Sequence, residues 1–385
     1  MKLVFISNTF GHYQIPLCTK WNELCDEFRF ITTKPMSDSM KKLGFTDWSK
    51  VYPYVTNAWE SAESEADALR RCLDADIVVA GACDEKFLTA RLKENKLTFR
   101  FTERIFKKGK RSLLKPSNLA SLYRLYTSNR KKNLYVLCTG ADCAADFRFI
   151  GMPKDKLLRW GYFPKVSELD IEEVLAKRGD EKIRIIWVGR MVELKHPREA
   201  ILAAEHLKKR GLSFELKMLG IGPLEDELHK LVEEKNLSDC VLLPGSVPSE
   251  QVRQEMENSH IFLMNSDKRE GWGAVVSEAM GSGCAVVISD EAGAARVLVR
   301  QNETGIYYPC GDQAALNEAL AKMVGDHDLR HRASENAYRQ MCELWNGDVA
   351  AERVLSFGRQ ILSGQKPAFY PNGPLSAACE EQRYV

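Results

Sequence analysis

Short apolar runs alternate with helical patterns along the whole chain. In the first half the runs predict six strands: KLVFIS (2–7), FRFITT (28–33), DIVVAG (76–81), LTFRFT (97–102), NLYVLCTG (133–140) and LLRWGYF (157–163). In the second half they predict six more: IRIIWVG (183–189), FELKMLG (214–220), VLLPG (241–245), IFLMNS (261–266), CAVVISD (284–290) and GIYY (305–308). Near-continuous apolar strands between amphipathic helices indicate parallel sheets covered on both faces. The pattern predicts an α/β protein with two doubly wound domains.

A polar, charged stretch between the two groups of strands predicts a linker near residues 164–180. We expect an N-terminal domain at 1–165 and a C-terminal domain at 166–345. A helix at 346–363 is expected to pack back on the N-terminal domain, and 364–385, with three prolines, is expected to be a mobile tail. Two doubly wound domains make a cleft, and ligands bind beyond the carboxyl ends of their strands. Chemistry is therefore expected in the loops after the strands.

Composition adds several negative expectations. At 385 residues the chain is long enough for two domains, and a net charge of +2 predicts no global attraction to nucleic acid or membranes. Eleven scattered cysteines without a Cys-x-x-Cys pair are typical of free thiols in a reducing cytoplasm. The N-terminus does not resemble a signal peptide, and no apolar stretch approaches the roughly 18 residues that span a bilayer. The seven histidines lie too far apart to predict a metal cluster.

The first candidate site is the motif WVGRMVELKHP. The predicted strand ends at Gly189, and Arg190 and Lys195 follow in the strand-to-helix loop. Pro197 suits the first turn of the next helix. Two fixed cations at a helix N-terminus are typical of a phosphate-binding site. The alternative is that both cations are solvated surface residues.

The second candidate site is the motif REGWGAVVSEAM, which carries Glu270 and Glu278. Gly271 and Gly273 let backbone amides approach a ligand closely, and the helix is predicted to begin near Ala274. Glu270 lies in the loop and can accept hydrogen bonds from hydroxyl groups. Glu278 lies about one helical turn further, where a carboxylate accepts well from a vicinal diol such as that of a ribose. The alternative is an internal salt bridge with an arginine.

These motifs resemble the retaining nucleotide-sugar glycosyltransferases of the GT-B fold. The resemblance is to the group 1 type (glycosyltransferase family 4) that capsule and lipopolysaccharide enzymes typify. The shared pattern is Arg190 and Lys195 after a strand, then two glutamates separated by seven residues, then GSGCAVVISDEAGA and NETGIYY. The resemblance covers residues 183–362, and it is weaker in the N-terminal half, through SNTFGHYQIPL and FTERIFKKG. Trp272 stands where the family has a phenylalanine.

The resemblance implies two Rossmann-like domains that face each other across a cleft, and it implies roles for the motif residues. Arg190 and Lys195 would hold the diphosphate of the donor without a metal. Glu278 would bind the ribose, and Glu270 would bind the donor sugar. The other donor-binding residues would be Gly11, Gly189, Val247 beside the base, Gly271, Trp272, Gly273 and Ala274. No carboxylate nucleophile stands out, and the resemblance implies front-face transfer in which the leaving phosphate helps deprotonate the acceptor.

The N-terminal half offers acceptor-side candidates. Gly11 and His12 follow the first predicted strand, in a loop that faces the donor phosphate and the acceptor in similar enzymes. His12 is a candidate to position the acceptor hydroxyl or assist proton transfer, and a structural role is the alternative. Glu103 and Arg104 follow another predicted strand, and intramolecular ion pairs are their alternative role. The predicted catalytic residues are thus Arg190, Lys195, Glu270 and His12.

Basic residues gather between Arg100 and Lys132, where eleven Lys or Arg face one acid, Glu103. The interleaved apolar residues are Ile105, Phe106, Leu113 and Leu114. Such a surface is typical of peripheral contact with an anionic membrane, where lipid-linked acceptors reside. A solvated face is the alternative. Nucleic acid is not an expected partner, because nothing resembles a reading helix or an RNA-binding aromatic set.

The prediction is a hexosyl- or related glycosyltransferase that is cytoplasmic and peripheral at the inner face of the membrane. It would transfer a sugar with retention from a nucleotide diphosphate donor, a UDP-sugar, to a saccharide or lipid-linked acceptor. The product would enter a surface polysaccharide or glycoconjugate. Two alternatives are a catalytically silent donor-binding partner subunit and a GT-B sugar-nucleotide epimerase. The sequence does not reveal the donor sugar, the base, the acceptor, the linkage or the oligomeric state.

Overall fold

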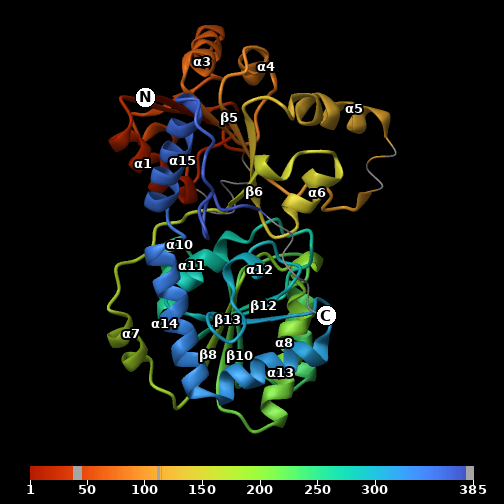
Figure 1. Cartoon of the computed structure of the whole chain (residues 1–385). Helices are drawn as coiled ribbons and strands as arrows, with labels where there is room; N and C mark the ends of the chain where they lie inside the picture. Colours follow the sequence, from red (N-terminus) through yellow and green to blue (C-terminus); the bar gives the residue numbers. More distant parts are fainter. Residues whose placement is uncertain (38–45, 111–112, 114, 379–385) are drawn as a thin grey trace. The chain divides into compact units, whose positions relative to one another are not determined.

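The chain forms two compact units, each built on one parallel sheet (Figure 1). The structure is a computed structural model that describes residues 1–37, 46–110, 113 and 115–378. The described residues of unit 1 lie within 1–165 and 344–378, and those of unit 2 are Val166–Glu343. All strand pairs within the two sheets are parallel, as the apolar runs predict. The α/β class with two doubly wound domains is confirmed.

The sheet of unit 1 has the strand order β3-β2-β1-β4-β5-β6-β7. Its strands are β1 (Lys2–Ser7), β2 (Glu27–Thr32), β3 (Val55–Asn57), β4 (Ile77–Ala80), β5 (Thr98–Glu103), β6 (Leu134–Thr139) and β7 (Leu157–Trp160). Its helices of seven residues or more are α1 (Ile15–Leu24), α3 (Ala62–Asp74), α4 (Lys86–Lys93), α5 (Pro116–Leu125), α6 (Cys143–Phe149) and α15 (Gly347–Leu362). The edge strand β3 is the one strand here that the apolar runs do not predict. It has only three residues, and two of them are half-buried.

The C-terminal helix α15 packs against α1 and so returns the chain to unit 1 (Figure 1). Asn346 caps it, because its side chain accepts a hydrogen bond of 2.9 Å from the amide of Val349. Gly347 allows a close approach, since a Cβ there would lie 2.7 Å from the backbone nitrogen of Leu17. Trp21 on α1 donates its indole N–H to the carbonyl of Ala351 at 3.1 Å. These contacts tie the two ends of the chain into one core.

The expectation of a mobile tail from Gly364 is wrong for the described residues up to 378. Leu375 is fully buried, and Ala378 is also buried. The amide of Arg159, on β7, donates to the carbonyl of Ser376 at 2.8 Å, and Leu375 donates back to the carbonyl of Arg159 at 2.9 Å. The prolines end regular structure here without removing the segment from the core, because apolar side chains still gain from burial.

The sheet of unit 2 has the order β10-β9-β8-β11-β12-β13. Its strands are β8 (Ile183–Val188), β9 (Phe214–Leu219), β10 (Val241–Gly245), β11 (Ile261–Met264), β12 (Ala285–Ser289) and β13 (Gly305–Tyr308). Its helices are α7 (Ile171–Arg178), α8 (Pro197–Lys209), α9 (Glu225–Glu234), α10 (Ser249–Glu257), α11 (Ala274–Gly281), α12 (Ala295–Leu298), α13 (Gln313–Gly325) and α14 (His327–Glu343). Helices α8 and α13 pack together on one face, and α11 and α14 pack together on the other (Figure 1).

Two further observations bear on the sequence-based expectations. The ten described cysteines are free thiols, and six of them are buried. No helix among the described residues is long and apolar enough to cross a membrane.

Candidate active site

The predicted donor-binding residues of unit 2 converge at one place on its sheet. Strand β8 leads outward to β9, whereas its other neighbour, β11, leads outward to β12. The loops after β8 and β11 therefore diverge at the carboxyl edge of the sheet, which is where doubly wound sheets bind ligands. Because Ile185 pairs with Ile261 across these strands, both loops start at a similar height. One loop carries Arg190 and Lys195, and the other carries Glu270.

The loop after β8 is fixed by backbone contacts to its neighbour. The amide of Gly189 donates to the carbonyl of Leu219 at 3.0 Å, and that of Met191 donates to the carbonyl of Ile221 at 3.0 Å. Gly220 has a φ of 138°, and a Cβ there would lie 1.9 Å from the carbonyl oxygen of Gly189. This turn after β9 thus needs glycine. Through these hydrogen bonds it holds Gly189 and Met191, the residues on both sides of the exposed Arg190.

Lys195 and Glu270 form an ion pair across the two loops. The ammonium group of Lys195 contacts Oε2 of Glu270, and the side chains are 14% and 19% exposed. The lysine stem runs past Gly189, where a Cβ would lie 3.5 Å from Cε of Lys195, an ordinary van der Waals distance. The structure therefore brings together two residues that the sequence assigned to different parts of a donor. The sequence did not predict their mutual pairing.

The loop before α11 has a conformation that only glycine adopts readily. Gly273 precedes the helix with a φ of 88°, and a Cβ there would lie 2.7 Å from Cε of Met264. Trp272 is fully buried, and its indole N–H lies 3.4 Å from Oγ of Ser277. A contribution of Trp272 to donor binding would therefore come through its backbone amide, and it stays a prediction. The ring supports the loop from inside, because a large apolar surface is more stable away from water.

A third loop, after β12, packs against the loop that carries Glu270 and Trp272. The amide of Gly293 donates to the carbonyl of Glu270 at 3.3 Å, and that of Ala294 donates to the carbonyl of Trp272 at 3.0 Å. A Cβ at Gly293 would lie 1.8 Å from the carbonyl oxygen of Gly271. The motif AGA of the sequence therefore serves the loop that carries Glu270.

The remaining predicted residues of unit 2 lie near the same edge of the sheet. Ala274 is the first residue of α11, and Glu278 lies half-buried one turn further along it. Val247 is half-buried in the loop after β10. The ends of β9 and β10 are joined here, because the amide of Gly220 donates to the carbonyl of Gly245 at 2.8 Å. Their roles toward a donor stay predictions.

The acceptor-side candidates lie in unit 1. Gly11 and His12 follow β1, and the amide of Gly11 donates to the side-chain oxygen of Gln14 at 2.7 Å. The rings of His12 and Tyr13 lie 5.1 Å apart, and Tyr13 packs edge-on against Tyr162 at 4.8 Å. The sequence analysis missed both tyrosines.

Glu103 and Arg104 each take part in intramolecular ion pairs, which was their alternative role. Glu103 pairs with Lys107 and also accepts a hydrogen bond of 3.1 Å from the hydroxyl of Tyr162. Arg104 contacts Asp142 at 3.2 Å and Asp146 at 3.4 Å. Asp142 and Asp146 carried no motif that would have identified them in the sequence.

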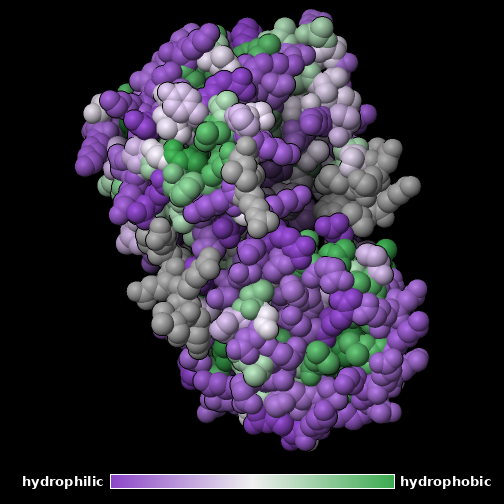
Figure 2. Space-filling model, turned by 90° about the vertical axis from the view of Figure 1, so that its right-hand side faces the viewer, coloured by the Kyte–Doolittle hydropathy of each residue, from purple (hydrophilic) through white to green (hydrophobic). Residues whose placement is uncertain are grey.

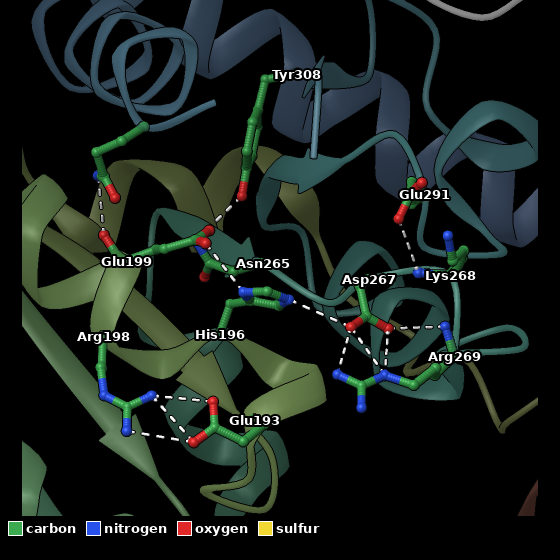
Figure 3. Close-up of polar contacts among 11 residues, drawn as sticks. Glu193, His196, Arg198, Glu199, Asn265, Asp267, Lys268, Arg269, Glu291 and Tyr308 are labelled. Carbon is green, nitrogen blue, oxygen red and sulfur yellow. Dashed lines mark hydrogen bonds and ion pairs between the residues drawn. The ribbon is translucent and has the colours of Figure 1, made fainter. Parts of the chain in front are cut away.

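A cluster that the sequence did not predict adjoins the Lys195–Glu270 pair (Figure 3). His196 contacts Glu199 and Asp267, and Asp267 in turn contacts Arg269. His196 stands between Lys195 and Pro197, which was its only signal in the sequence. Among the described residues, no group of three or more His, Cys, Asp or Glu side chains is arranged to hold a metal ion.

Comparisons with known proteins identify the class. Residues 170–340 match the family model of the glycosyl transferases group 1. AmsK, an amylovoran biosynthesis glycosyltransferase of Erwinia amylovora, is 32% identical over 51% of this chain and 52% of its own length. CapM, a capsular polysaccharide biosynthesis glycosyltransferase of Staphylococcus aureus, is 25% identical over 62% of this chain and 59% of its own. The chain thus spans little more than half the length of these curated relatives.

The solved structures extend the likeness to both units. Anabaena Alr3699/HepE, crystallised in complex with UDP, aligns with a TM-score of 0.69 and 16% identity. The alignment covers 94% of this chain and all of that one. The fold is therefore the GT-B fold. The match to the group 1 glycosyl transferase model lies at residues 170–340, wholly within unit 2. The resemblance seen in the motifs is confirmed.

Proposed function

We propose that the chain transfers a hexosyl or related sugar from a UDP-sugar, with retention, to a saccharide or lipid-linked acceptor. The synthesis of a surface polysaccharide or glycoconjugate is the process that the names of AmsK and CapM support. The UDP found in HepE supports the choice of base. The observation that carries the proposal is the Lys195–Glu270 pair at the point where the loops of unit 2 diverge, with Arg190 beside it.

The ion pair suggests how a donor would be received. A diphosphate brings more negative charge to Lys195 than one carboxylate does, so the lysine would turn from Glu270 to the phosphates. Glu270 would then accept hydrogen bonds from the donor sugar, and Glu278 would accept them from the ribose. Donor binding thus exchanges one ion pair for another at the same loops. No carboxylate is left without a partner, which limits the cost of burying it.

Transfer would follow from the same arrangement. Breaking the anomeric C–O bond leaves negative charge on the diphosphate, which Lys195 and the exposed Arg190 would stabilise without a metal. In front-face transfer the acceptor oxygen bonds to the anomeric carbon on the side that the phosphate leaves. The phosphate oxygen takes the proton of the acceptor hydroxyl, so anomeric configuration is retained. His12, in unit 1, would position that hydroxyl.

A donor screen tests this proposal. The protein is melted with UDP, GDP, ADP, CMP and their common sugar conjugates, with and without magnesium. A saturable rise in the melting temperature with UDP, independent of magnesium, is expected, because a ligand that binds only the folded state stabilises it. If none of the nucleotides shifts the melting temperature, the proposed donor site is wrong. Hydrolysis of an isotope-labelled UDP-sugar then separates an active enzyme from a silent donor-binding subunit, and an epimerised nucleotide sugar would indicate the epimerase.

Peripheral contact with the inner face of an anionic membrane is part of the proposal, through a narrower surface than the sequence predicted. Arg100, Arg104 and Lys107 are engaged in ion pairs within unit 1, so their charges are largely neutralised. Leu114 and two of its neighbours lie outside the described residues. What supports contact is α5, which buries none of its residues and exposes Leu119 by 53%.

Apolar groups beside cations extend this surface. Tyr123, also on α5, is 60% exposed, and Phe149 is 55% exposed with the ammonium group of Lys110 3.8 Å from its ring centroid. Figure 2 looks from the side on which α5 lies in Figure 1, and there hydrophobic residues form separate areas within a hydrophilic surface. Exposed aromatic and aliphatic groups beside lysines are typical of helices that lie in a membrane interface.

Vesicle sedimentation tests this contact. We expect the protein to sediment with anionic phosphatidylglycerol vesicles at low salt and to be released at high salt. The double variant L119E/Y123E should lose most of this binding. L362E is the control, because Leu362 at the end of α15 is 49% exposed and lies outside this surface. Equal binding by the two variants, or none by the wild type, would reject the contact.

A further inference from the structure

The ring of His196 lies between two carboxylates that come from different loops (Figure 3). Its Nδ1 lies 2.9 Å from Oε1 of Glu199, in the first turn of α8. Its Nε2 lies 3.3 Å from Oδ2 of Asp267, in the loop after β11. The ring therefore spans the same two loops that Lys195 and Glu270 span.

Asp267 joins the loops in a second way. Its amide donates to the carbonyl of Leu194 at 3.0 Å, and its own carbonyl accepts from the amide of Glu270 at 2.9 Å. Its carboxylate accepts from Nη2 of Arg269 at 2.6 Å. Asp267 is thus three residues from Glu270 along the chain and in contact with the residues on both sides of Lys195.

The backbone at His196 explains why this ring is so placed. His196 adopts the left-handed conformation, with φ of 46° and ψ of 49°, and Pro197 follows as the first residue of α8. Few residues other than glycine and asparagine adopt this conformation readily. In this turn the side chain of His196 lies against Asp267 of the other loop. Contacts of the ring would offset the strain of the turn.

The proton count of the site favours a charged ring. Two carboxylates offer only acceptors, and a neutral imidazole has a single N–H. Only imidazolium can donate to Glu199 and Asp267 at once. The hydrogen bond to Glu199 raises the pKa of His196 above its ordinary value, burial opposes this, and the charge of Glu199 and the contact with Asp267 add to the rise. Burial alone would raise the pKa of Asp267, yet the bonds from Arg269 and His196 lower it.

Other charged and titratable groups surround this cluster. From the turn before α8 and its first turn they are Glu193, Lys195, Arg198 and Glu199; from the loop after β11 they are Asp267, Lys268, Arg269 and Glu270; beyond β12 and β13 they are Asp290, Glu291, Tyr308 and Cys310. Several are already paired: Arg198 with Glu193, Arg269 with Asp267, and Lys195 with Glu270. The charged groups that contact the ring of His196 directly are therefore the carboxylates of Glu199 and Asp267.

We propose that His196 is a positioning residue that, when protonated, clamps the loop of Lys195 to the loop of Glu270. This inference rests on the proposed function in treating those two residues as donor-binding. Deprotonation removes one of the two hydrogen bonds and turns a ring lone pair toward a carboxylate. The loops then separate more readily, and donor binding and turnover weaken. Because the folded-state pKa is raised, the clamp is complete below the ordinary pKa of histidine and is lost as the pH rises through the raised value.

The variant H196N tests this clamp. Asparagine tolerates the left-handed backbone, so the fold should persist while the two-ended contact is lost. H196G, which relaxes the turn fully, is the second variant and guards against a misfolded H196N. At pH 6 we expect kcat/KM for the UDP-sugar to fall about tenfold in both, since loosened positioning of reacting groups costs rate. The ratio of wild-type to variant kcat/KM should approach one as the pH rises toward 8.5.

H327N is the matched control. His327 also lies between two carboxylates, 3.1 Å from Asp180 and 3.0 Å from Asp328. Asp180 precedes β8, so this histidine marks the amino edge of the sheet, opposite to His196. H327N should match the wild type at every pH. A ratio for H196N that does not change with pH, or a pH-dependent loss in H327N, would overturn the proposal.

A second measurement does not depend on the donor. In nitrogen-15 histidine spectra, His196 is assigned by the signal that is missing in H196N. Its ring should keep both protons beyond pH 6.5, the ordinary pKa of histidine, and lose one only at higher pH. The protection factors of the amides of Asp267 and Glu270, which are corrected for the intrinsic pH dependence of exchange, should fall as that signal titrates. A ring that is neutral throughout, or exchange that ignores its titration, would reject the clamp even in a protein that binds UDP. If the wild type binds no nucleotide while these signals behave as expected, the proposed function fails and the clamp does not.

Discussion

The two sheets share one strand order, yet the edges at which their loops emerge carry different side chains. In both units the first strand lies between the second and the fourth, so each sheet has a point where its loops diverge. In unit 1, two cations near that edge pair with acids of the same unit. Arg100 contacts Glu85 at 2.6 Å, and Lys107 pairs with Glu103. The charges of Arg100 and Lys107 are therefore already balanced within unit 1.

At the corresponding edge of unit 2, Arg190 is exposed on the loop after β8, and the ammonium group of Lys195 pairs with the carboxylate of Glu270 from the loop after β11. What unit 1 has instead is aromatic surface, with Tyr13 and Tyr162 packed edge to face after β1 and β7. Rings and carboxylates suit neutral hydroxyl-rich ligands, and paired cations suit phosphates. Under the proposed function, the same topology would carry the donor site in unit 2 and the acceptor-side residues in unit 1.

Removing one lysine from each edge should give the largest difference. K195A is expected to lower kcat about 10²–10³-fold, because a preorganised charge that stabilises the leaving diphosphate is lost. K107A removes the equivalent lysine–glutamate pair of unit 1 and should change kcat less than about twofold, as exposed pairs contribute little. Steady-state kinetics with the UDP-sugar from the donor screen measures both. Comparable losses in the two variants would show that the difference between the two lysine–glutamate pairs has no functional meaning.

Backbone geometry offers a second contrast, this time within unit 2. In G220A a methyl group would stand 1.9 Å from the carbonyl oxygen of Gly189, at a φ of 138°, so the loop that carries Arg190 must shift. We expect a loss of about 3 kcal/mol or more in the free energy of unfolding. Gly211, after α8, has a φ of 70° but open space around its Cβ position. G211A should cost only about 1 kcal/mol, the strain of the left-handed backbone.

Urea unfolding followed by circular dichroism compares these two glycine variants. If G220A is no less stable than G211A, the close contact between the turns after β8 and β9 does not require glycine at position 220. If G220A is unstable but keeps the wild-type affinity for UDP, the turn does not position Arg190.

The sequence predicted the fold in detail because apolar burial determines it. Each of the twelve predicted strands is present within about three residues at its ends. The missed strand, β3, has three residues and too little burial to show an apolar run. The tail was misjudged because its prolines were given more weight than Leu375 and Ala378, which are buried.

The site was predictable only as far as local sequence reaches. Arg190, Lys195 and Glu270 each follow a predicted strand, which places them at the carboxyl edge. The pairing of Lys195 with Glu270 depends on β8 and β11 being neighbours, and strand order has no local signature. Whether Trp272 points inward depends on the backbone of its loop, which glycines leave open. Asp267, one of the two partners of His196, comes from another loop, so nothing beside His196 in the sequence indicated that contact.

The smallest contrast concerns one tyrosine hydroxyl in each unit. The hydroxyl of Tyr308, on β13, accepts a hydrogen bond of 3.1 Å from Nδ2 of Asn265, which is fully buried (Figure 3). The hydroxyl of Tyr162 donates over the same distance of 3.1 Å to Glu103, which also pairs with Lys107 and is partly exposed. Y308F leaves a buried amide unsatisfied and should cost about 1–3 kcal/mol of unfolding free energy, whereas Y162F should cost about 0.5–1 kcal/mol.

Urea midpoints of the two tyrosine variants measure this difference. Equal losses of unfolding free energy would mean that the two edges replace a lost hydrogen bond equally well. A larger loss for Y308F would mean that Asn265 finds no other partner when the Tyr308 hydroxyl is removed, whereas Glu103 does when the Tyr162 hydroxyl is removed. An edge of the second kind can exchange its internal bonds for those of a hydroxyl-rich ligand at low cost, because Glu103 keeps Lys107 whichever hydroxyl it accepts. Y162F should accordingly leave UDP affinity unchanged and alter only the KM for the acceptor.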